Sequence, residues 1–214
     1  MNLKHTAILF VALSPLAAHA GTVRSEVSQD LADARAEVRT ELAQERAKLD
    51  SENLSLGDSL HFGKEGKAEA ARRRALPEGE ITPRGDLLVD GKAVAIDEAQ
   101  RRQLLDYRAQ VIDVAKAGID AGERAAMLAI DATDVSLFRM IAGAMTGSLE
   151  RKVESAVRRE IQPAVLQICR RLPQLRDSQQ ALAASLPEFK PYATLADDDV
   201  ADCENDVRNE LAMR

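Results

Sequence analysis

The clearest β pattern in the chain lies at residues 80–97, which read EITPRGDLLVDGKAVAID. The segments 86–89 and 92–96 are rich in Leu, Val and Ile and are predicted to be short strands. Asp90-Gly91 lies between them, and a type I′ turn favours this dipeptide because both central residues need a positive φ. Two strands alone are marginally stable in water, so we expect this hairpin to rest on a helix or to join further strands.

The chain after Asp97 shows helical periodicity up to its last residues. Asp97 is predicted to cap the first of these helices, because its carboxylate can accept hydrogen bonds from N–H groups of the first turn. Pro163 is predicted to kink or restart a helix, Pro173 to open the next one and Pro187 to end it. The spacing of Gly118 and Gly122 indicates either a tight crossing of two helices or a bend.

The region before the hairpin divides into three segments. Apolar side chains in residues 25–50 recur every three or four positions, which predicts a helix with one narrow apolar stripe. Residues 53–62 alternate apolar and polar side chains, which predicts a second short hairpin. Residues 63–79 are predicted to be a polar linker or a short exposed helix. The linker contains a basic run, Arg72, Arg73 and Arg74. This run is either a charged loop open to proteolysis or a contact site for anionic lipid or a partner protein.

The first residues of the chain have the pattern of a secretory signal peptide. A basic start precedes an apolar run at residues 6–13, which is too short to span a membrane, because a span takes roughly 20 apolar residues. Ala18-His19-Ala20 forms a small-x-small cleavage signal, so we expect the mature chain to begin at Gly21, with residues 21–24 unstructured. The sequence therefore predicts an exported, periplasmic protein with no transmembrane span after cleavage.

The two cysteines each extend an apolar helical stripe. Cys169 follows Val165 by four residues, and Cys203 lies between Val200 and Val207. Both side chains are therefore expected to face a core, where they can form a disulfide that the oxidising periplasm preserves. The alternative is a pair of buried free thiols.

Composition narrows the possible functions. The formal net charge is −6, and aromatic residues make up only 3% of the chain. This balance argues against nucleic-acid binding, which usually shows as a basic domain or stripe. After removal of the signal peptide only His61 remains, which leaves too few ligands for a zinc site and one candidate base for a nucleophilic triad. We therefore predict no cofactor and no metal.

These patterns predict a mainly α-helical protein with a small antiparallel β-hairpin element, in which a helical bundle packs beside one or two short hairpins. Four segments are expected: a signal peptide at residues 1–20, a charged helical extension at 21–52, a short hairpin and polar linker at 53–79, and a hairpin-plus-helical-bundle domain at 80–214. The extension is expected to dock weakly or to bind a partner, and proteolysis is expected to begin in the linker.

Two stretches carry a resemblance to known proteins. The first reads ITPRGDLLVDGK from Ile81 and continues to Tyr107, and the second reads CRRL from Cys169 and continues to Leu182. Together they are similar to the YggN-like family, exported proteobacterial proteins of unknown function. At its amino end the chain departs from the family, whose members begin with a Cys-containing β segment. The resemblance implies periplasmic residence and supplies no activity, catalytic residues or cysteine pairing.

The sequence favours a non-enzymatic periplasmic protein that acts through helical surfaces on an unknown envelope protein or on a second copy of itself. One alternative is a peripheral envelope protein that binds anionic lipid through arginine-rich helix faces, a contact that salt would weaken. Another is an enzyme that uses carboxylates alone, for which the densest acidic cluster is Asp197, Asp198, Asp199, Asp202 and Glu204. That cluster lacks the central glycine of a calcium loop and can simply complement a helix N-terminus.

Overall fold

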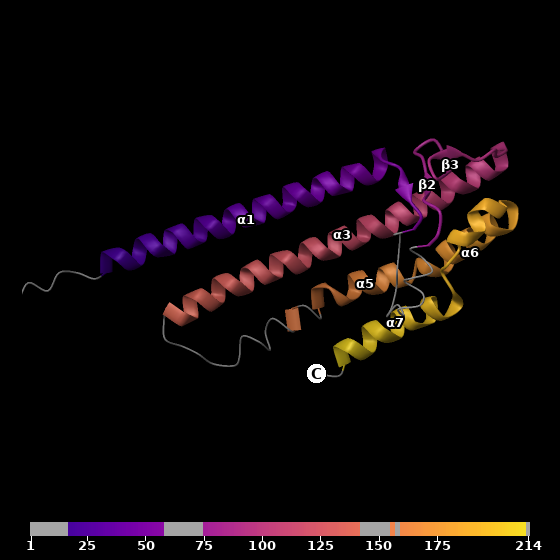
Figure 1. Ribbon diagram of the computed structural model, residues 1–214. Helices are drawn as coiled ribbons and strands as arrows, with labels where there is room; N and C mark the ends of the chain where they lie inside the picture. Colours follow the sequence, from indigo (N-terminus) through magenta and orange to yellow (C-terminus); the bar gives the residue numbers. More distant parts are fainter. Residues whose placement is uncertain (1–16, 58–74, 142–154, 157–158, 213–214) are drawn as a thin grey trace, which may run out of the picture.

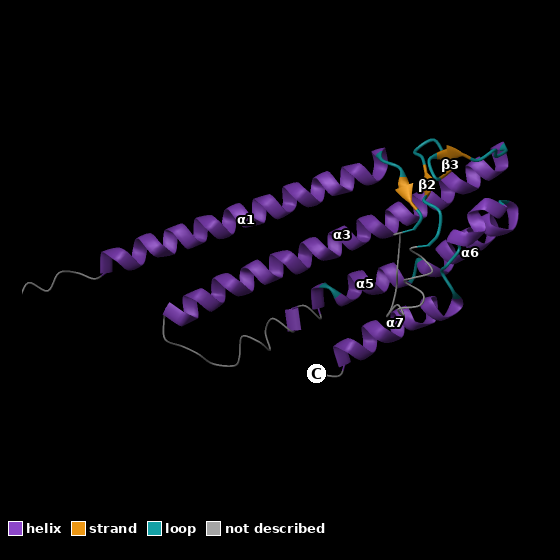
Figure 2. Ribbon diagram, in the orientation of Figure 1, coloured by secondary structure: helices purple, strands orange, loops and turns teal. Residues whose placement is uncertain are grey.

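The computed structural model describes residues 17–57, 75–141, 155–156 and 159–212. This part of the chain is mainly helical and contains a small antiparallel sheet of four strands (Figure 1; Figure 2). The predicted fold class, a helical protein with a small antiparallel β element, is therefore confirmed.

The sheet is formed by β1 (Leu54–Ser55), β2 (Gly79–Ile81), β3 (Leu87–Val89) and β4 (Lys92–Ala93), which pair in this order. Between β3 and β4, Asp90 and Gly91 have φ values of 49° and 71°, as a type I′ turn requires. Gly85 has a φ of 80° and closes the β2–β3 turn, where its N–H donates to the Thr82 carbonyl over 2.9 Å. Both turns thus depend on residues that tolerate a positive φ.

The region before β2 differs from the prediction. β1 is the first strand of the predicted second hairpin, but it pairs with β2, with Leu54 opposite Ile81. A two-residue strand is stabilised more by an existing hairpin edge than by another isolated short segment. Residues 58–62, the predicted second strand, lie outside the described residues. The predicted linker also ended too late, because Gly79 already belongs to β2.

The helices are α1 (Ala17–Ser51), α3 (Glu98–Ile141), α5 (Gln162–Cys169), α6 (Leu172–Ser185) and α7 (Asp197–Ala212), with the 3₁₀ helix η1 (Pro187–Tyr192) between α6 and α7. Asp97 caps α3, because its Oδ1 accepts hydrogen bonds from the N–H groups of Ala99 and Gln100 at 2.8 Å each. The Gln100 side chain accepts the Asp97 N–H in return, which completes a capping box. Pro163 and Pro173 lie in the first turns of α5 and α6, where a missing N–H costs nothing.

One expectation about the helices was wrong, and one of two alternatives is excluded. Residues 21–24, expected to be unstructured, are helical, because α1 already begins at Ala17. The alanine-rich residues upstream are strong helix formers and let the helix propagate through Gly21. No tight crossing occurs at Gly118 and Gly122, since a Cβ atom added at either position would meet nothing within 4 Å.

α3 is the central helix of the molecule (Figure 1). α1 lies along one side of it, α5, α6 and α7 lie on the other side, and the sheet covers the end where α3 begins. The largest fully buried apolar side chains come from the sheet, α3, α6, η1 and the residue between α6 and η1: Ile81, Leu87, Leu104, Val111, Leu172, Leu175, Leu182, Phe189 and Leu186. Among the α1 side chains that the structure describes, none belongs to this core.

Candidate interaction surface

Ion pairs hold α1 against α3 along their shared length. Among the side chains that the structure describes, four pairs connect the two helices: Arg35 with Asp131, Arg39 with Glu123, Arg46 with Asp120, and Asp50 with Lys116. Because the residue numbers rise along α1 as they fall along α3, the helices are antiparallel (Figure 1). Exposed ion pairs contribute only about 0–1 kcal/mol each to stability, so these pairs mainly set the register and orientation of α1.

The apolar stripe of α1 is only partly covered. We define this stripe as Val27, Leu31, Ala34, Val38 and Leu42, which follow one another every three or four residues. All five are partly buried, and none of the described α1 side chains is fully buried. An amphipathic helix is stabilised mainly by the apolar face that it buries, so α1 has capacity for a further contact.

A row of acidic side chains runs along α1 on the side away from its arginines. We call Glu26, Asp30, Asp33, Glu37 and Glu41 the acidic row; all five are exposed. At 3.6 residues per turn, the apolar stripe separates this row from the arginines that contact α3. No cation within the described residues forms an ion pair with the acidic row. Among the side chains that the structure describes, its negative charge therefore has no ion-pair partner.

A groove of about 590 Å³ lies on the arginine side of the α1–α3 pair. Its lining combines three apolar residues of α3 and the following helical segment with a larger charged set: Met127, Leu128, Ala156, Asp120, Glu123, Arg124, Asp131, Arg159 and Glu160. Half of the charged residues, Asp120, Glu123 and Asp131, are the α3 partners of the α1 arginines. These three acidic residues of the groove therefore already help to hold α1 against α3.

On the opposite side, α3 exposes a face of small residues. Gly118, Gly122, Ala125 and Ala129 are all exposed and follow one another every three or four residues. Since the arginines and their acidic partners occupy one side of the helix pair, the acidic row and this small-residue face adjoin on the other side. The space above both glycines is open.

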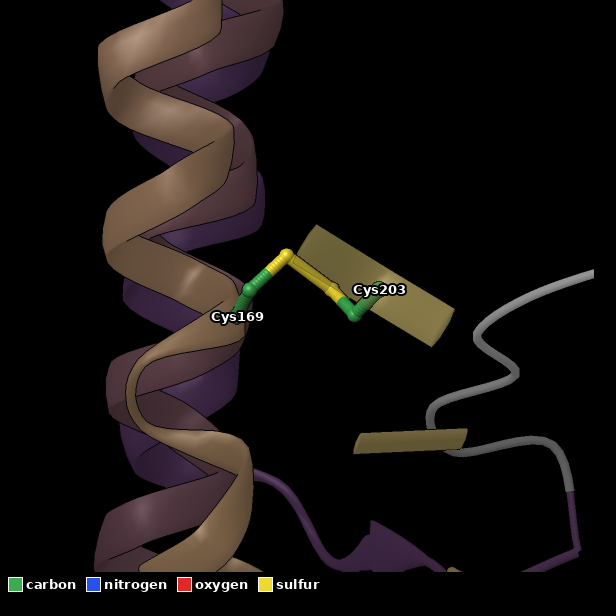
Figure 3. Close-up of a disulfide and its surroundings, with 2 residues drawn as sticks. All are labelled: Cys169 and Cys203. Atoms are coloured by element: carbon green, nitrogen blue, oxygen red, sulfur yellow. A yellow bond between two sulfur atoms is a disulfide. The ribbon is translucent and has the colours of Figure 1, made fainter. Parts of the chain in front are cut away.

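A disulfide joins α5 to α7 (Figure 3). The Cα atoms of Cys169 and Cys203 are 5.6 Å apart, and 34 positions separate the two residues in the sequence. Cys169 is 2% exposed, while Val200 and Cys203 of α7 pack against the core from outside. The predicted disulfide is therefore present, and it fastens a helix that has no fully buried side chain among those described.

The other predicted site residues divide into two groups. Asp90 and Gly91 form the β3–β4 turn, and Oδ1 of Asp90 also accepts the Glu78 N–H over 3.0 Å. The basic run of Arg72, Arg73 and Arg74 lies outside the described residues.

The acidic cluster at the start of α7 has structural partners. Asp197 pairs with Arg176, and Oδ2 of Asp199 accepts the Ala196 N–H over 2.8 Å at the start of the helix. The hydrogen bond that Arg176 donates to Asp177 and the negative charge of Asp197 raise the pKa of Arg176. Within the described residues, no group of three or more His, Cys, Asp or Glu side chains is arranged to hold a metal ion.

Two buried polar residues were not predicted as structural centres. Arg108 of α3 is 8% exposed and reaches the C-terminal end of α1. Gln179 of α6 is 5% exposed; its Nε2 donates to the Tyr192 carbonyl and the Tyr107 hydroxyl, at 3.1 and 3.2 Å, and its Oε1 accepts the Leu195 N–H. Burial raises the pKa of Tyr107, an effect that the Gln179 hydrogen bond opposes. The sequence signal for Gln179 was its position within an apolar stripe.

Gly79 is a third residue that sequence reasoning missed. A Cβ atom at this position would lie 2.5 Å from Cζ of Tyr192, so β2 approaches η1 too closely for any side chain. The Tyr192 hydroxyl donates to the Pro77 carbonyl over 3.0 Å, and burial raises the pKa of this tyrosine, with a further contribution from the charge of Asp90. No local pattern indicates this contact, because its partners are far apart in the sequence.

None of the helices in the described part of the chain combines the length and the apolar composition that a bilayer crossing requires. Comparison of the chain with protein-family models, with curated proteins and with solved structures finds no match. The resemblance to the YggN-like family therefore stays a prediction.

Proposed function

We propose that the protein is a non-enzymatic, exported interaction protein that binds another envelope protein through the α1–α3 pair. The observation that carries this proposal is the partial burial of α1, a helix of 35 residues with no described side chain in the core. A helix with one narrow apolar stripe needs apolar contact to be stable, and α3 supplies only part of it. A partner protein would cover the rest of the apolar stripe of α1.

Two further features support the proposal. The cleavage signal before Gly21 and the Cys169–Cys203 disulfide both suit an oxidising compartment outside the cytoplasm. Two carboxylates from the places where an enzyme would most readily use them, the groove and the start of α7, are also engaged elsewhere: Asp120 pairs with Arg46 and Asp197 pairs with Arg176. These pairs give the carboxylates a structural role and support an interaction protein over a carboxylate-only enzyme.

Photo-crosslinking in living cells tests the proposal. A photoreactive residue is placed at Gln29 or Gln44, which are exposed on α1, and at Gln180 of α6 as the matched control. We expect a discrete protein adduct from the α1 positions and none from Gln180. An equal pattern at all three positions, or no adduct at any, would contradict binding through α1.

The anionic-lipid alternative is tested with the same purified protein. Flotation with anionic vesicles at low and high salt measures whether arginine-rich faces bind a charged surface, since salt weakens such a contact. We expect no flotation, because the acidic row of α1 repels an anionic surface. Salt-sensitive flotation would favour the lipid alternative instead.

A further inference from the structure

We infer that the side of the α1–α3 pair formed by the acidic row and the small-residue face of α3 docks a cationic amphipathic helix of a partner protein. This inference rests on the proposed interaction function and adds the chemistry of the partner. Three observations carry it: the acidic row without an ion-pair partner among the described side chains, the incomplete cover of the apolar stripe, and the open space over the α3 glycines.

The charge argument uses a contact that the molecule already makes. On the other side of the pair, Arg35, Arg39 and Arg46 of α1 bind acidic side chains of α3. In the acidic row, five carboxylates repeat at the same three- or four-residue spacing without a cation from the described residues. A third helix with Lys or Arg at this spacing would repeat the existing contact, and complementary charge would select it over other helices.

The shape argument concerns the approach of a backbone. A Cβ atom added at Gly118 or Gly122 meets no atom within 4 Å, and Ala125 and Ala129 extend this low surface along α3. Small residues let helices come close together, and the partly covered stripe of α1 borders the same site. The site therefore suits an apolar helix face flanked by cations.

The same charge disfavours two other occupants. A second copy of the chain would bring its own acidic row to the contact, and like charges facing one another cost free energy. An anionic lipid surface would meet the same repulsion. A cationic helix is the occupant whose charge matches the site.

The probe is a synthetic helical peptide of about 18 residues, because the acidic row spans roughly 22 Å at 1.5 Å per residue. The peptide has a Leu stripe flanked by Lys at three- or four-residue spacing, and its control has Gln in place of each Lys. We expect the Lys peptide to bind the oxidised protein at least tenfold more tightly than the Gln peptide at low salt, with the difference shrinking at high salt.

Two double variants locate the site. Asp30→Lys with Glu37→Lys reverses charge within the acidic row and is expected to lower the affinity for the Lys peptide at least tenfold. Asp106→Lys with Glu188→Lys makes the same change in net charge at exposed positions outside the site. The affinity of this variant for the Lys peptide is expected to stay within about twofold of that of the unmodified protein. Circular dichroism of both variants verifies that they fold.

Several results would overturn the inference. Equal binding of the Lys and Gln peptides would show that charge does not select the partner. An equal loss of affinity for the Lys peptide in both double variants would show that only the net charge of the protein matters. Concentration-dependent self-association that Asp30→Lys with Glu37→Lys abolishes would identify a second copy as the occupant. If the peptide fails while the α1 cross-link in cells persists, only the cationic helix is rejected and the interaction function stands.

Discussion

Arg108 of α3 donates a hydrogen bond from Nη2 to the Leu49 carbonyl of α1 over 2.9 Å. The same nitrogen lies 3.2 Å from the Asp50 carbonyl and 2.8 Å from the Glu52 carbonyl, so one guanidinium serves the C-terminal end of α1. A cation is favourable there, because the last carbonyls of a helix are unpaired and carry partial negative charge. This contact ties α1 to the core at one end, although α1 contributes no described side chain to that core.

Arg108→Ala is expected to destabilise the protein by roughly 2 kcal/mol, because three partly buried hydrogen bonds to carbonyls lose their charged donor. Denaturant unfolding followed by circular dichroism measures the change. Arg102→Ala is the matched control, since Arg102 lies on the same helix but is exposed. Equal loss in the two variants would show that the cap at the end of α1 is unimportant.

Truncation should show that the domain boundary predicted from the sequence, between residues 79 and 80, is in the wrong place. A protein that begins at Glu41 keeps the acceptors of Arg108 and the core residue Leu56, and we expect its melting temperature to change by only a few degrees. A protein that begins at Leu76 lacks both and should melt at a clearly lower temperature. Calorimetry measures the melting temperatures of the two truncated proteins. Identical values would support the boundary predicted between residues 79 and 80.

Gly79→Ala is expected to lower the melting temperature, because the new Cβ would overlap the Tyr192 ring at 2.5 Å. Gly118→Ala has open space around it and lies within α3, so it is expected to stabilise by about 0.5–1 kcal/mol through helix propensity. Thermal unfolding of both variants provides the comparison. A neutral or stabilising Gly79→Ala would disprove the close approach of β2 and η1.

The Asp86–Arg101 pair predicts a dependence of stability on pH. The hydrogen bond from Arg101 holds the pKa of Asp86 below its ordinary value of 3.8. A lowered folded-state pKa means that the pair stabilises the protein above the ordinary pKa and loses this effect as pH falls through the lowered one. Asp86→Asn should therefore lower the melting temperature at neutral pH, and this effect should shrink as the pH falls through the lowered pKa of Asp86. Asp106→Asn, at an exposed position, is the control.

Loss of the disulfide should loosen α7 before the rest of the molecule. Replacing Cys169 and Cys203 by Ala opens a loop of 34 positions. On the chain-entropy model this is expected to lower the free energy of unfolding by about 3–4 kcal/mol. Hydrogen exchange should accelerate first in α7, whose described side chains are not fully buried, while α3 stays protected. Uniform acceleration across the chain would show that the disulfide stabilises the whole fold instead.

The sequence by itself determined the elements whose conformation depends on near neighbours. Asp90-Gly91 specifies its turn because both residues tolerate a positive φ, and Asp97 starts α3 because its carboxylate reaches N–H groups two and three residues away. The spacing of Cys169 and Cys203 on apolar stripes likewise indicated that both face the interior. Such preferences act within one or two turns of chain, so they can be recognised without knowing the fold.

Only the tertiary structure decided the contacts between distant segments. Arg108 and Leu49 are 59 positions apart, and Tyr192 and Pro77 are 115 apart. The pairing of β1 with β2 and the side of α1 that stays open also depend on how α3 places its neighbours. No local pattern encodes these choices, because each one is set by the packing of surfaces that are complete only after the helices have assembled.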